Sequence, residues 1–181
     1  MIVWIDGVLG IGKSTTAQNL WQKHLRSNGE LLDSDEYFTK LCNADIRLTF
    51  CSIFANDNPL FLQRFRSVIE QKVSSSNKDL IVTIALIRQE SKKYLFDPLI
   101  SQNIPTLHFV LTANRDTIVS RIKADIDRDQ MTALNTLDDN IKFLEKNFQD
   151  AIWIDTEDKD ALAVADQIFH IYQQFKNEIK G

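Results

Sequence analysis

The segment from Gly7 to Ser14 constrains the fold of this chain more than any other. It reads Gly-Val-Leu-Gly-Ile-Gly-Lys-Ser and follows an apolar run. A glycine, four residues and then Gly-Lys-Ser is the spacing of a phosphate-binding loop. Glycine allows positive φ angles, so successive N–H groups can form a concave nest for phosphate oxygens. We therefore predict that nine consecutive residues bind a nucleotide: Gly7, Val8, Leu9, Gly10, Ile11, Gly12, Lys13, Ser14 and Thr15.

The polar residues that close this loop have predicted chemical roles. Lys13 is expected to act in catalysis by placing an ammonium group beside the β and γ phosphates, and Ser14 offers a hydroxyl ligand to Mg²⁺. The helix that begins here adds the positive end of its dipole. The alternative is a chance match in a glycine turn, which the preceding strand and the following helix disfavour. The loop predicts a nucleoside triphosphate and Mg²⁺ as ligands.

The rest of the chain alternates predicted strands with predicted helices, which is typical of a parallel sheet covered on both faces. We predict one domain over residues 1–181, an α/β P-loop fold with a five-stranded parallel doubly wound sheet and a short lid. The expected strands span residues 2–6, 30–33, 80–86, 105–111 and 151–154. The expected helices span residues 13–27, two or three segments between 34 and 76, then 90–102, 116–123, 138–148 and 160–176. Within the second region, Pro59 is well placed at a helix start.

Charge and composition limit the partners and the location. The net charge is −4, whereas binding a nucleic acid usually requires a basic face. No stretch is apolar for long enough to span a membrane, and no signal-peptide pattern follows Met1. Cys42 and Cys51 lack CxxC spacing and are expected to be reduced thiols. We predict a cytoplasmic protein with no nucleic-acid partner and no membrane span, and we leave the oligomeric state open.

The last predicted helix has one broad apolar side. Such a helix either docks on the sheet or lies on a membrane surface. We expect docking, because the last helix of such a fold normally covers the sheet. The residues on this side are Leu162, Ala165, Ile168, Phe169, Tyr172 and Phe175.

Two absences narrow the class of phosphate-loop protein. A GTPase would need Asn-Lys-x-Asp after the fourth strand, where this chain has Asn114-Arg115-Asp116 with the wrong spacing. Motor and transporter ATPases usually end a strand in an acidic residue, and residues 80–87 contain none. The remaining class is the kinases of small molecules and nucleotides, which use ATP and bind the acceptor across the carboxyl edge of the sheet.

Two aspartates follow the second predicted strand, where the crevice of such a sheet opens. The segment Asp33-Ser34-Asp35 resembles the Asp-x-Asp of shikimate and gluconate kinases. This resemblance implies that Asp33 supports Mg²⁺ through water and that Asp35 holds the acceptor hydroxyl as a catalytic residue. The alternative is structural: Ser34 or Asp35 caps a helix over residues 36–41.

A cationic segment after the fourth strand is the candidate lid. Leu111-Thr112-Ala113, followed by Arg121 and Arg128, is similar to the lid entry of these kinases. We predict that Arg121 and Arg128 neutralise charge on the transferring phosphoryl group, because Lys13 and Mg²⁺ neutralise only part of it. The alternative for Arg121 is an exposed ion pair with Asp125, one helical turn further on.

Most of the chain resembles the tunicamycin-resistance ATP-binding family. The shared features are the opening Trp-Ile-x-Gly, the Leu-Thr-Ala before the lid and a late Asp-Thr at residues 155–156. The loop after Thr156 is where we expect the adenine. Residues 40–76 do not align, so the identity of the acceptor stays open.

The region between the second and third strands has two interpretations. Its aromatic and cationic side chains either form the acceptor pocket or pack as core and solvated surface, and we favour the second because phenylalanines at helical spacing are usually core. The aromatic and cationic side chains concerned are Phe50, Phe54, Phe61 and Phe65 with Arg47, Arg64 and Arg66.

The histidines at positions 24, 108 and 170 show no triad or ligand spacing, and we assign them no chemistry.

Together these features predict an Mg²⁺-dependent kinase that transfers the γ-phosphoryl group of ATP to a small-molecule hydroxyl or phosphate. One alternative is an ATP-binding drug-resistance or sequestration protein that does not turn over, as the family resemblance permits. Another is a regulatory ATP switch with a protein partner.

Overall fold

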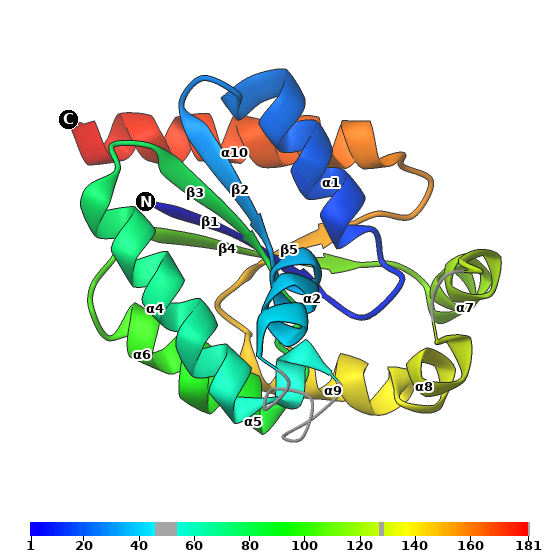
Figure 1. The fold of residues 1–181 in the computed structure, drawn as a ribbon. Helices are drawn as coiled ribbons and strands as arrows, with labels where there is room; N and C mark the ends of the chain where they lie inside the picture. The colour runs from blue at the N-terminus through cyan, green and yellow to red at the C-terminus, as the bar shows by residue number, and fades with distance from the viewer. Residues whose placement is uncertain (46–53, 127–128, 181) are drawn as a thin grey trace.

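The computed structural model describes residues 1–45, 54–126 and 129–180. Five parallel strands form one sheet in the order β2-β3-β1-β4-β5 (Figure 1). Parallel neighbours need crossover connections, and helices supply them. The strands are β1 (Ile2–Gly7), β2 (Gly29–Asp33), β3 (Asp79–Thr83), β4 (Thr106–Thr112) and β5 (Ile152–Asp155). The predicted fold class is confirmed.

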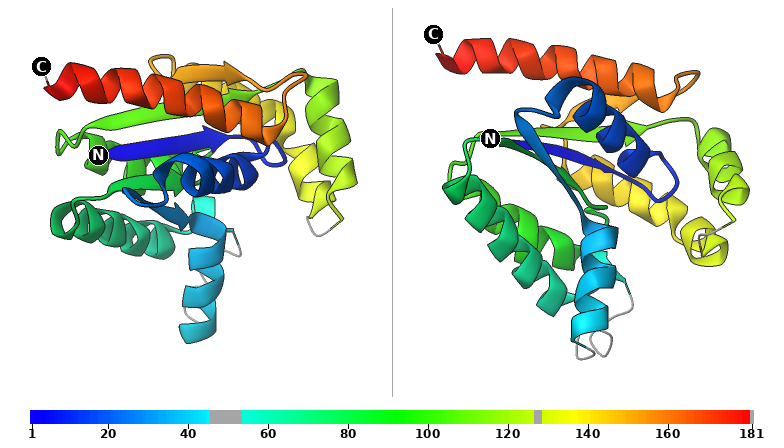
Figure 2. Two further views of the ribbon diagram at one scale, coloured as in Figure 1. Left: turned by 90° about the horizontal axis from the view of Figure 1, so that it is seen from above. Right: turned by 45° about the horizontal axis from the view of Figure 1, so that its top comes forward.

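Two layers of helices enclose the sheet (Figure 2). Helices α1 (Lys13–Leu20) and α10 (Ala161–Lys180) lie on one face, and α4 (Pro59–Ser75), α6 (Asp97–Ile100) and α9 (Leu137–Asn147) lie on the other. Helix α2 (Ser34–Ala44) projects from the carboxyl edge of the sheet. The remaining turns and helices are η1 (Trp21–Leu25), η2 (Ala55–Asp57), α5 (Gln89–Ser91), η3 (Lys92–Phe96), α7 (Arg115–Ala124) and α8 (Gln130–Asn135).

Strand β1 lies at the centre of the sheet, and all six of its residues are buried. The chain leaves β1 toward β2 and β3 on one side and later reaches β4 on the other side. A crevice opens where the strand order reverses in this way, at the carboxyl ends of the strands. The phosphate-binding loop follows β1 directly and so begins at this crevice.

The phenylalanines of the middle region belong mainly to the core. Phe61 and Phe65 of α4 are fully buried and stack with their centroids 5.3 Å apart. Arg64 pairs with Asp45 at 2.9 Å, and Arg66 lies 3.5 Å from Glu70. Phe54 is more exposed and lines the cavity described below, whereas Phe50 and Arg47 lie outside the described residues. The core interpretation is therefore confirmed for Phe61 and Phe65.

The last helix docks on the domain, as predicted. Ala165, Ile168 and Tyr172 are buried, and α10 packs along α1. Leu162 was wrongly placed on the buried side: it is 42% exposed, and Val164 is buried. No helix in the described part of the chain is long and apolar enough to cross a membrane.

Two predicted boundaries are wrong for local reasons. The third strand ends at Thr83 and not at residue 86, because its neighbours β2 and β1 pair with it only as far as Asp33 and Ile5. The first helix continues beyond α1 as a π-helical turn, η1, which ends at Leu25 and not at residue 27. Pro59 begins α4 as predicted, with Asn58 as its N-cap.

Candidate functional site

The phosphate-binding loop requires glycine for two different reasons. Gly7, Gly10 and Gly12 all have positive φ angles, of 140°, 80° and 101°. A Cβ atom on Gly7 would lie 2.8 Å from the carbonyl oxygen of Leu111, and one on Gly10 would lie 2.6 Å from the side chain of Ile122. Gly12 has open space around it, so its requirement is conformational. No side chain caps the start of α1, which leaves this helix end available to an anion.

Lys13 lies over the loop. Its Nζ donates hydrogen bonds to the carbonyl oxygens of Gly7 at 3.0 Å and Val8 at 2.9 Å. Ser14 follows at the second position of α1. Both Lys13 and Ser14 line the cavity of about 440 Å³ that is described below. This arrangement suits a polyphosphate, because the ammonium can exchange carbonyl oxygens for phosphate oxygens without moving the backbone.

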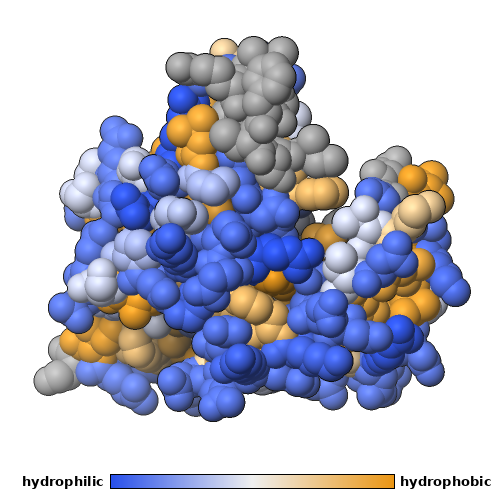
Figure 3. Space-filling model, turned by 90° about the horizontal axis from the view of Figure 1, so that it is seen from below, coloured by the Kyte–Doolittle hydropathy of each residue, from blue (hydrophilic) through white to orange (hydrophobic). Residues whose placement is uncertain are grey.

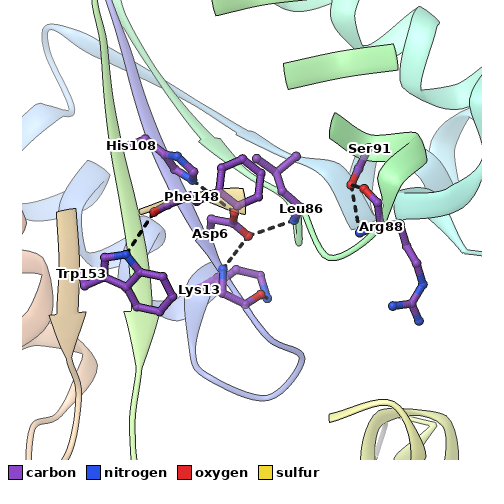
Figure 4. Close-up of polar contacts among 9 residues, drawn as sticks. Asp6, Lys13, Leu86, Arg88, Ser91, His108, Phe148 and Trp153 are labelled. Atoms are coloured by element: carbon purple, nitrogen blue, oxygen red, sulfur yellow. Dashed lines mark hydrogen bonds and ion pairs between the residues drawn. The ribbon is translucent and has the colours of Figure 1, made fainter. Parts of the chain in front are cut away.

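Asp6 anchors the base of the loop, a role that the sequence analysis did not identify. Its buried carboxylate accepts hydrogen bonds from the N–H groups of Gly7 at 2.6 Å and Leu86 at 2.9 Å (Figure 4). His108 on β4 lies with its Nε2 3.2 Å from the second oxygen. Asp6 thereby ties the loop to the segment that follows β3. The signal available in the sequence was an acidic residue at the end of a buried strand.

The imidazole of His108 is held by aromatic rings. The centroids of Phe96 and Phe148 lie 4.8 and 5.0 Å from its own. Trp153 on β5 donates its indole N–H to the carbonyl oxygen of Phe148 at 3.1 Å (Figure 4). His108 is thus a support for Asp6 beneath the loop, and it lies among the core residues.

Asp33 is both a helix cap and a cavity residue. One carboxylate oxygen accepts from the N–H groups of Asp35 at 2.9 Å and Glu36 at 3.4 Å, and the other accepts from the Thr83 hydroxyl at 2.8 Å. The predicted alternative cap, Ser34 or Asp35 before a helix over 36–41, is therefore wrong by one or two residues, because α2 begins at Ser34. Capping and cavity lining are compatible at this position.

Asp35 is exposed in the first turn of α2, with the Ser34 hydroxyl 3.4 Å from its carboxylate. Asp33, Asp35, Lys13 and Ser14 all line one cavity of about 440 Å³. The structure thus brings together the residues that the sequence predicted for phosphate, metal and acceptor binding.

This cavity lies between the phosphate loop, α2 and the α7–α8 segment. Figure 3 shows the notch between the projecting α2 column and the mass formed by α7 and α8. Its walls include Phe38 and Thr39 of α2, Phe54 and Asn56 at η2, and Thr83, Ile84 and Ala85 at the end of β3. Asp125, Asp129 and Thr132 line the opposite wall. The sequence analysis considered Asp125 only as an ion-pair partner of Arg121 and assigned no role to Asp129, Thr132 or Thr83.

A magnesium ion fits this site only together with phosphate oxygens and water. Within the described ranges no group of three or more His, Cys, Asp or Glu side chains could hold a metal. Ser14 and Asp33 are oxygen donors of the kind Mg²⁺ prefers, and this ion commonly keeps waters and substrate phosphates in its shell. The donor set therefore matches a nucleotide-bound ion.

Arg121 lies on the other side of the phosphate loop. Its guanidinium donates to the hydroxyl of Thr156 at 2.8 Å and to the carbonyl oxygen of Thr156 at 2.9 Å. The Thr156 hydroxyl in turn donates to the carbonyl oxygen of Thr112 at 2.9 Å. These bonds engage the guanidinium with the loop after β5, so the alternative considered for Arg121, an ion pair with Asp125, is not the observed arrangement. Arg128 lies outside the described residues.

A second hollow of about 170 Å³ lies beside Arg121. It is lined by Gly12 and Thr15 of the phosphate loop and α1, by Arg121, and by Thr156 and Lys159 of the loop after β5. It adjoins the loop where the sequence analysis placed the adenine. Arg121 therefore lines this second hollow and not the cavity that contains Lys13 and Ser14.

A larger hollow of about 820 Å³ lies at the opposite edge of the sheet, between η1 and α10. Its lining includes Asp79 at the start of β3, and it contains no residue of the phosphate loop. Ligands of open parallel sheets bind at the carboxyl ends of the strands. The smaller cavity at the phosphate loop is therefore the candidate site, despite its volume.

Solved structures share this fold. The tunicamycin resistance protein of Deinococcus radiodurans matches with 20% identity over 95% of both chains and a TM-score of 0.72. The thymidylate kinase of Candida albicans matches with 19% identity over 97% of this chain and 92% of its own, with a TM-score of 0.65. Shikimate kinase from Acinetobacter baumannii, in complex with shikimate, matches with 18% identity over 97% and 94%, with a TM-score of 0.61. At these low identities, the structural matches show that the chain shares the fold of P-loop kinase-like proteins.

A search of curated proteins finds no match to the sequence. A family model described as an AAA domain, AAA_33, matches residues 2–139, which is more than half of the chain. The protein therefore belongs to the AAA_33 family of AAA domains.

Proposed function

We propose that this protein is an Mg²⁺-dependent kinase that transfers the γ-phosphoryl group of ATP to a hydroxyl or phosphate of a small molecule. One observation carries the proposal: the loop residues Lys13 and Ser14 face the same cavity as Asp33 and Asp35. Phosphoryl transfer requires a phosphate cradle and an acceptor site in one enclosure, because positioning and electrostatics provide most of the catalysis.

The residues divide between holding the phosphates and preparing the acceptor. The loop backbone and Lys13 bind the triphosphate, and Ser14 and Asp33 are the residues that would hold Mg²⁺. When bound, this ion neutralises charge on the phosphate oxygens. Asp35, at the start of α2, accepts the proton of the acceptor hydroxyl, which is the role of a general base.

We place the adenine in the hollow beside Arg121 and Thr156. The guanidinium and the loop after β5 frame this hollow, and a planar guanidinium stacks well on an aromatic ring. The catalytic roles of Arg121 and Arg128 stay predictions. Because ATP with Mg²⁺ is abundant in the cytoplasm, we also keep the prediction of a cytoplasmic protein with no nucleic-acid partner.

ADP release in the presence of candidate acceptors tests the proposal. A panel of nucleosides, nucleotides, sugars and antibiotics is incubated with ATP and Mg²⁺, and ADP and the phosphorylated product are measured by chromatography. We expect at least one acceptor to raise ADP release well above the hydrolysis background. Asp35→Asn should reduce that rate about a hundredfold while leaving ATP binding nearly intact. Asp150→Asn, at an exposed turn, is the matched control.

The second candidate is an ATP-binding resistance or sequestration protein without turnover. Two observations favour it: β3 ends in Thr83 and not in an acidic residue, and the guanidinium of Arg121 is bonded to Thr156. Such a protein would be stabilised against heat by ATP and by its second ligand without releasing ADP. Ligand-induced stabilisation with no turnover across the whole panel would decide for this candidate.

A further inference from the structure

We propose that Thr83 is a positioning residue, whose hydroxyl holds the carboxylate of Asp33 so that it presents one fixed acceptor site to the cavity at the phosphate loop. This inference rests on the proposed function, in which Asp33 helps to bind Mg²⁺ together with the nucleotide. It deepens that function by naming the residue on the neighbouring strand that gives Asp33 its orientation.

The register of the sheet brings Thr83 and Asp33 together. Asp33 is the last residue of β2, Thr83 is the last residue of β3, and the two are partners in the parallel pairing of these strands. Side chains of directly paired residues on neighbouring strands point to the same face of the sheet. Both residues also line the cavity that contains Lys13 and Ser14. The contact between them therefore depends on the pairing of two strands that are distant in the chain.

The Thr83 side chain is a rigid hydrogen-bond donor. It is only 2% exposed, so its hydroxyl requires a partner within the fold. Its Oγ1 donates to Oδ2 of Asp33 at 2.8 Å, whereas the hydroxyls of Thr106 and Thr136 donate to backbone carbonyl oxygens. Because threonine is branched at Cβ, its χ1 angle is restricted and the donor has little freedom to move.

The hydrogen bonds of Asp33 leave one acceptor site open. A carboxylate has about four lone-pair sites on its two oxygens. Two of these sites, both on Oδ1, accept from the N–H groups of Asp35 and Glu36, and a third, on Oδ2, accepts from Thr83. Among the described residues no further donor reaches Asp33. The site left on Oδ2 is therefore open to Mg²⁺ or to a water molecule that this ion binds.

The role of Asp33 as a helix cap does not by itself orient this oxygen. The cap bonds hold Oδ1, but rotation about the last side-chain bond of an aspartate is otherwise broad. The bond from Thr83 holds the second oxygen and so fixes the plane of the carboxylate. Outer partners that orient a ligand in this way commonly change metal affinity by about 10–100-fold. The presentation of Asp33 to the cavity therefore depends on Thr83 as well as on α2.

Thr83 also lies between Asp33 and the strand that leads into the phosphate loop. Strand β3 lies between β2 and β1, and Thr83 pairs on its other side with Ile5 of β1. The loop begins at Gly7, two residues after Ile5. The strand pairing thus fixes the position of Asp33 relative to the loop, and the Thr83 hydroxyl fixes the orientation of its carboxylate.

A neutral hydroxyl at the end of β3 suits the charge of the site. An acidic residue at this position would place two carboxylates in register on neighbouring strands, where their like charges repel. Thr83 avoids this repulsion and supplies a donor to the single carboxylate. The pair explains how the predicted metal ligand can lie on β2 in a chain whose β3 does not end in an acidic residue.

Substitutions of Thr83 test the inference through nucleotide binding, which needs neither an acceptor nor turnover. Thr83→Val removes the hydroxyl and keeps the branched shape, and Thr83→Ala is a second variant without the hydroxyl. Titration calorimetry measures the affinity for a non-hydrolysable ATP analogue over a range of Mg²⁺ concentrations, and also without metal in the presence of EDTA. We expect the Mg²⁺ concentration that gives half of the metal-dependent gain in affinity to rise about three- to tenfold, with the metal-free affinity unchanged.

Two further variants separate positioning from packing. Thr83→Ser restores the hydroxyl without the methyl group and should recover the Mg²⁺ dependence of the wild type. In an Asp33→Asn background, Thr83→Val should cause no further change in Mg²⁺ dependence, because the carboxylate through which Thr83 acts is absent. Thr106→Val is the matched control, since Thr106 begins β4 at the opposite end of the sheet and donates to the carbonyl oxygen of Ile104.

Several results would overturn the inference. Unchanged Mg²⁺ dependence in both hydroxyl-free variants would do so, as would an equal loss of affinity with and without the metal. A Thr83→Ser variant that behaves like Thr83→Val would assign the effect to packing. Additive effects of Thr83→Val and Asp33→Asn would show that Thr83 does not act through Asp33.

The outcomes also separate this inference from the proposed function. Transfer to an acceptor with normal Mg²⁺ dependence in Thr83→Val keeps the kinase assignment and overturns the inference. The expected binding result without transfer to any acceptor supports the inference and contradicts the kinase assignment. Nucleotide affinity that does not respond to Mg²⁺ in the wild type overturns both.

Discussion

Residues at the phosphate loop have two kinds of role: some are expected to bind the nucleotide, and others support the backbone of the loop. Lys13 contributes an ammonium group that donates hydrogen bonds to the loop carbonyl oxygens of Gly7 and Val8. Asp6 contributes a buried carboxylate that holds Gly7 and Leu86 by their N–H groups. The first residue can therefore be changed with little effect on folding, whereas the second cannot.

For Lys13→Ala we expect a loss of ATP affinity of about ten- to a hundredfold, because a hydrogen bond between charged groups contributes about 1.5–3 kcal/mol. The melting temperature should stay within about 2 °C of that of the wild type, since Lys13 is not a core residue. Titration calorimetry and thermal unfolding measure the two effects. Lys40→Ala, on the exposed side of α2, is the control. Unchanged affinity would contradict the phosphate-loop assignment.

Asp6 is expected to act through its acceptor oxygens. Asp6→Ala leaves the N–H groups of Gly7 and Leu86 without a partner, at a cost of about 2–4 kcal/mol of unfolding free energy. Asp6→Asn keeps an acceptor oxygen and should lose less than half as much. Urea denaturation of both variants gives the comparison, and ATP affinity should fall in parallel with stability. Equal destabilisation by the two substitutions would show that the charge beside His108 matters more than the acceptor.

At the scale of elements, the start of α2 combines capping with metal binding. Asp33 caps this helix and also lines the cavity. Asp33→Ala should lower stability by about 1 kcal/mol and raise the Mg²⁺ requirement, whereas Asp33→Asn should keep the cap and affect only the Mg²⁺ requirement. Urea denaturation and Mg²⁺ titration of ATP binding distinguish the two effects. Normal Mg²⁺ dependence in both variants would leave Asp33 as a cap alone.

A second link joins α7 to the loop after β5. Arg121 binds Thr156, and Glu157 accepts from the Thr117 hydroxyl at 2.5 Å and from the Asn114 N–H at 2.8 Å. These hydrogen bonds lower the pKa of the Glu157 carboxyl. They hold both sides of the hollow that we assign to the nucleotide base.

Arg121→Ala distinguishes the two roles considered for this arginine. Contact with the base predicts an ATP affinity about tenfold lower with kcat nearly unchanged, and this is the outcome we expect from its position. Stabilisation of the transferring phosphoryl group predicts kcat about a hundredfold lower with little change in affinity. Binding of ATP and steady-state rates separate the two, measured for this variant and for the control Arg26→Ala, an exposed residue that follows η1.

At the scale of the whole molecule, Asp79 connects the sheet to the last helix. It accepts from the Tyr172 hydroxyl at 2.7 Å, from Lys176 at 2.7 Å and from the amino group of Met1 at 3.0 Å. Burial alone would raise the pKa of the Asp79 carboxyl, but these donors outweigh it and the pKa is lowered. Burial, together with the negative charge of Asp79, raises the pKa of Tyr172.

Asp79→Asn should reduce the free energy of unfolding by about 2 kcal/mol at pH 7, because it weakens hydrogen bonds to a charged acceptor. The folded-state pKa lies below the ordinary value of 3.8, so the contribution of the carboxylate is complete above that value. It is lost as pH falls through the lowered pKa. Urea denaturation at pH 7, 5 and 3 should show the difference between wild type and variant narrowing only below about pH 4. A constant difference across this range would contradict the linkage.

The sequence determined the fold class and the phosphate loop because both depend on local patterns. Three glycines at fixed spacing set the backbone of the loop, and an unbroken apolar run over residues 2–5 could only be a strand covered on both faces. Alternation of strands and helices then implied a parallel sheet. Pro59 marked the start of α4 for the same local reason, its fixed φ angle.

Only the tertiary structure decided which side chains share a site. Asp125 and Asp129 are about ninety residues from Asp35 in the chain, and only the return of the chain past β4 places them on one cavity. The bonds of Asp6 to Leu86 and His108 join three neighbouring strands or their ends, which no local pattern encodes. Arg121 illustrates the same limit, since its helix was predicted but its partner, Thr156, follows a strand far along the chain. Hydrophobic periodicity indicates whether a segment is a helix or a strand and which of its faces is buried. The packing of distant elements determines which side chains come into contact.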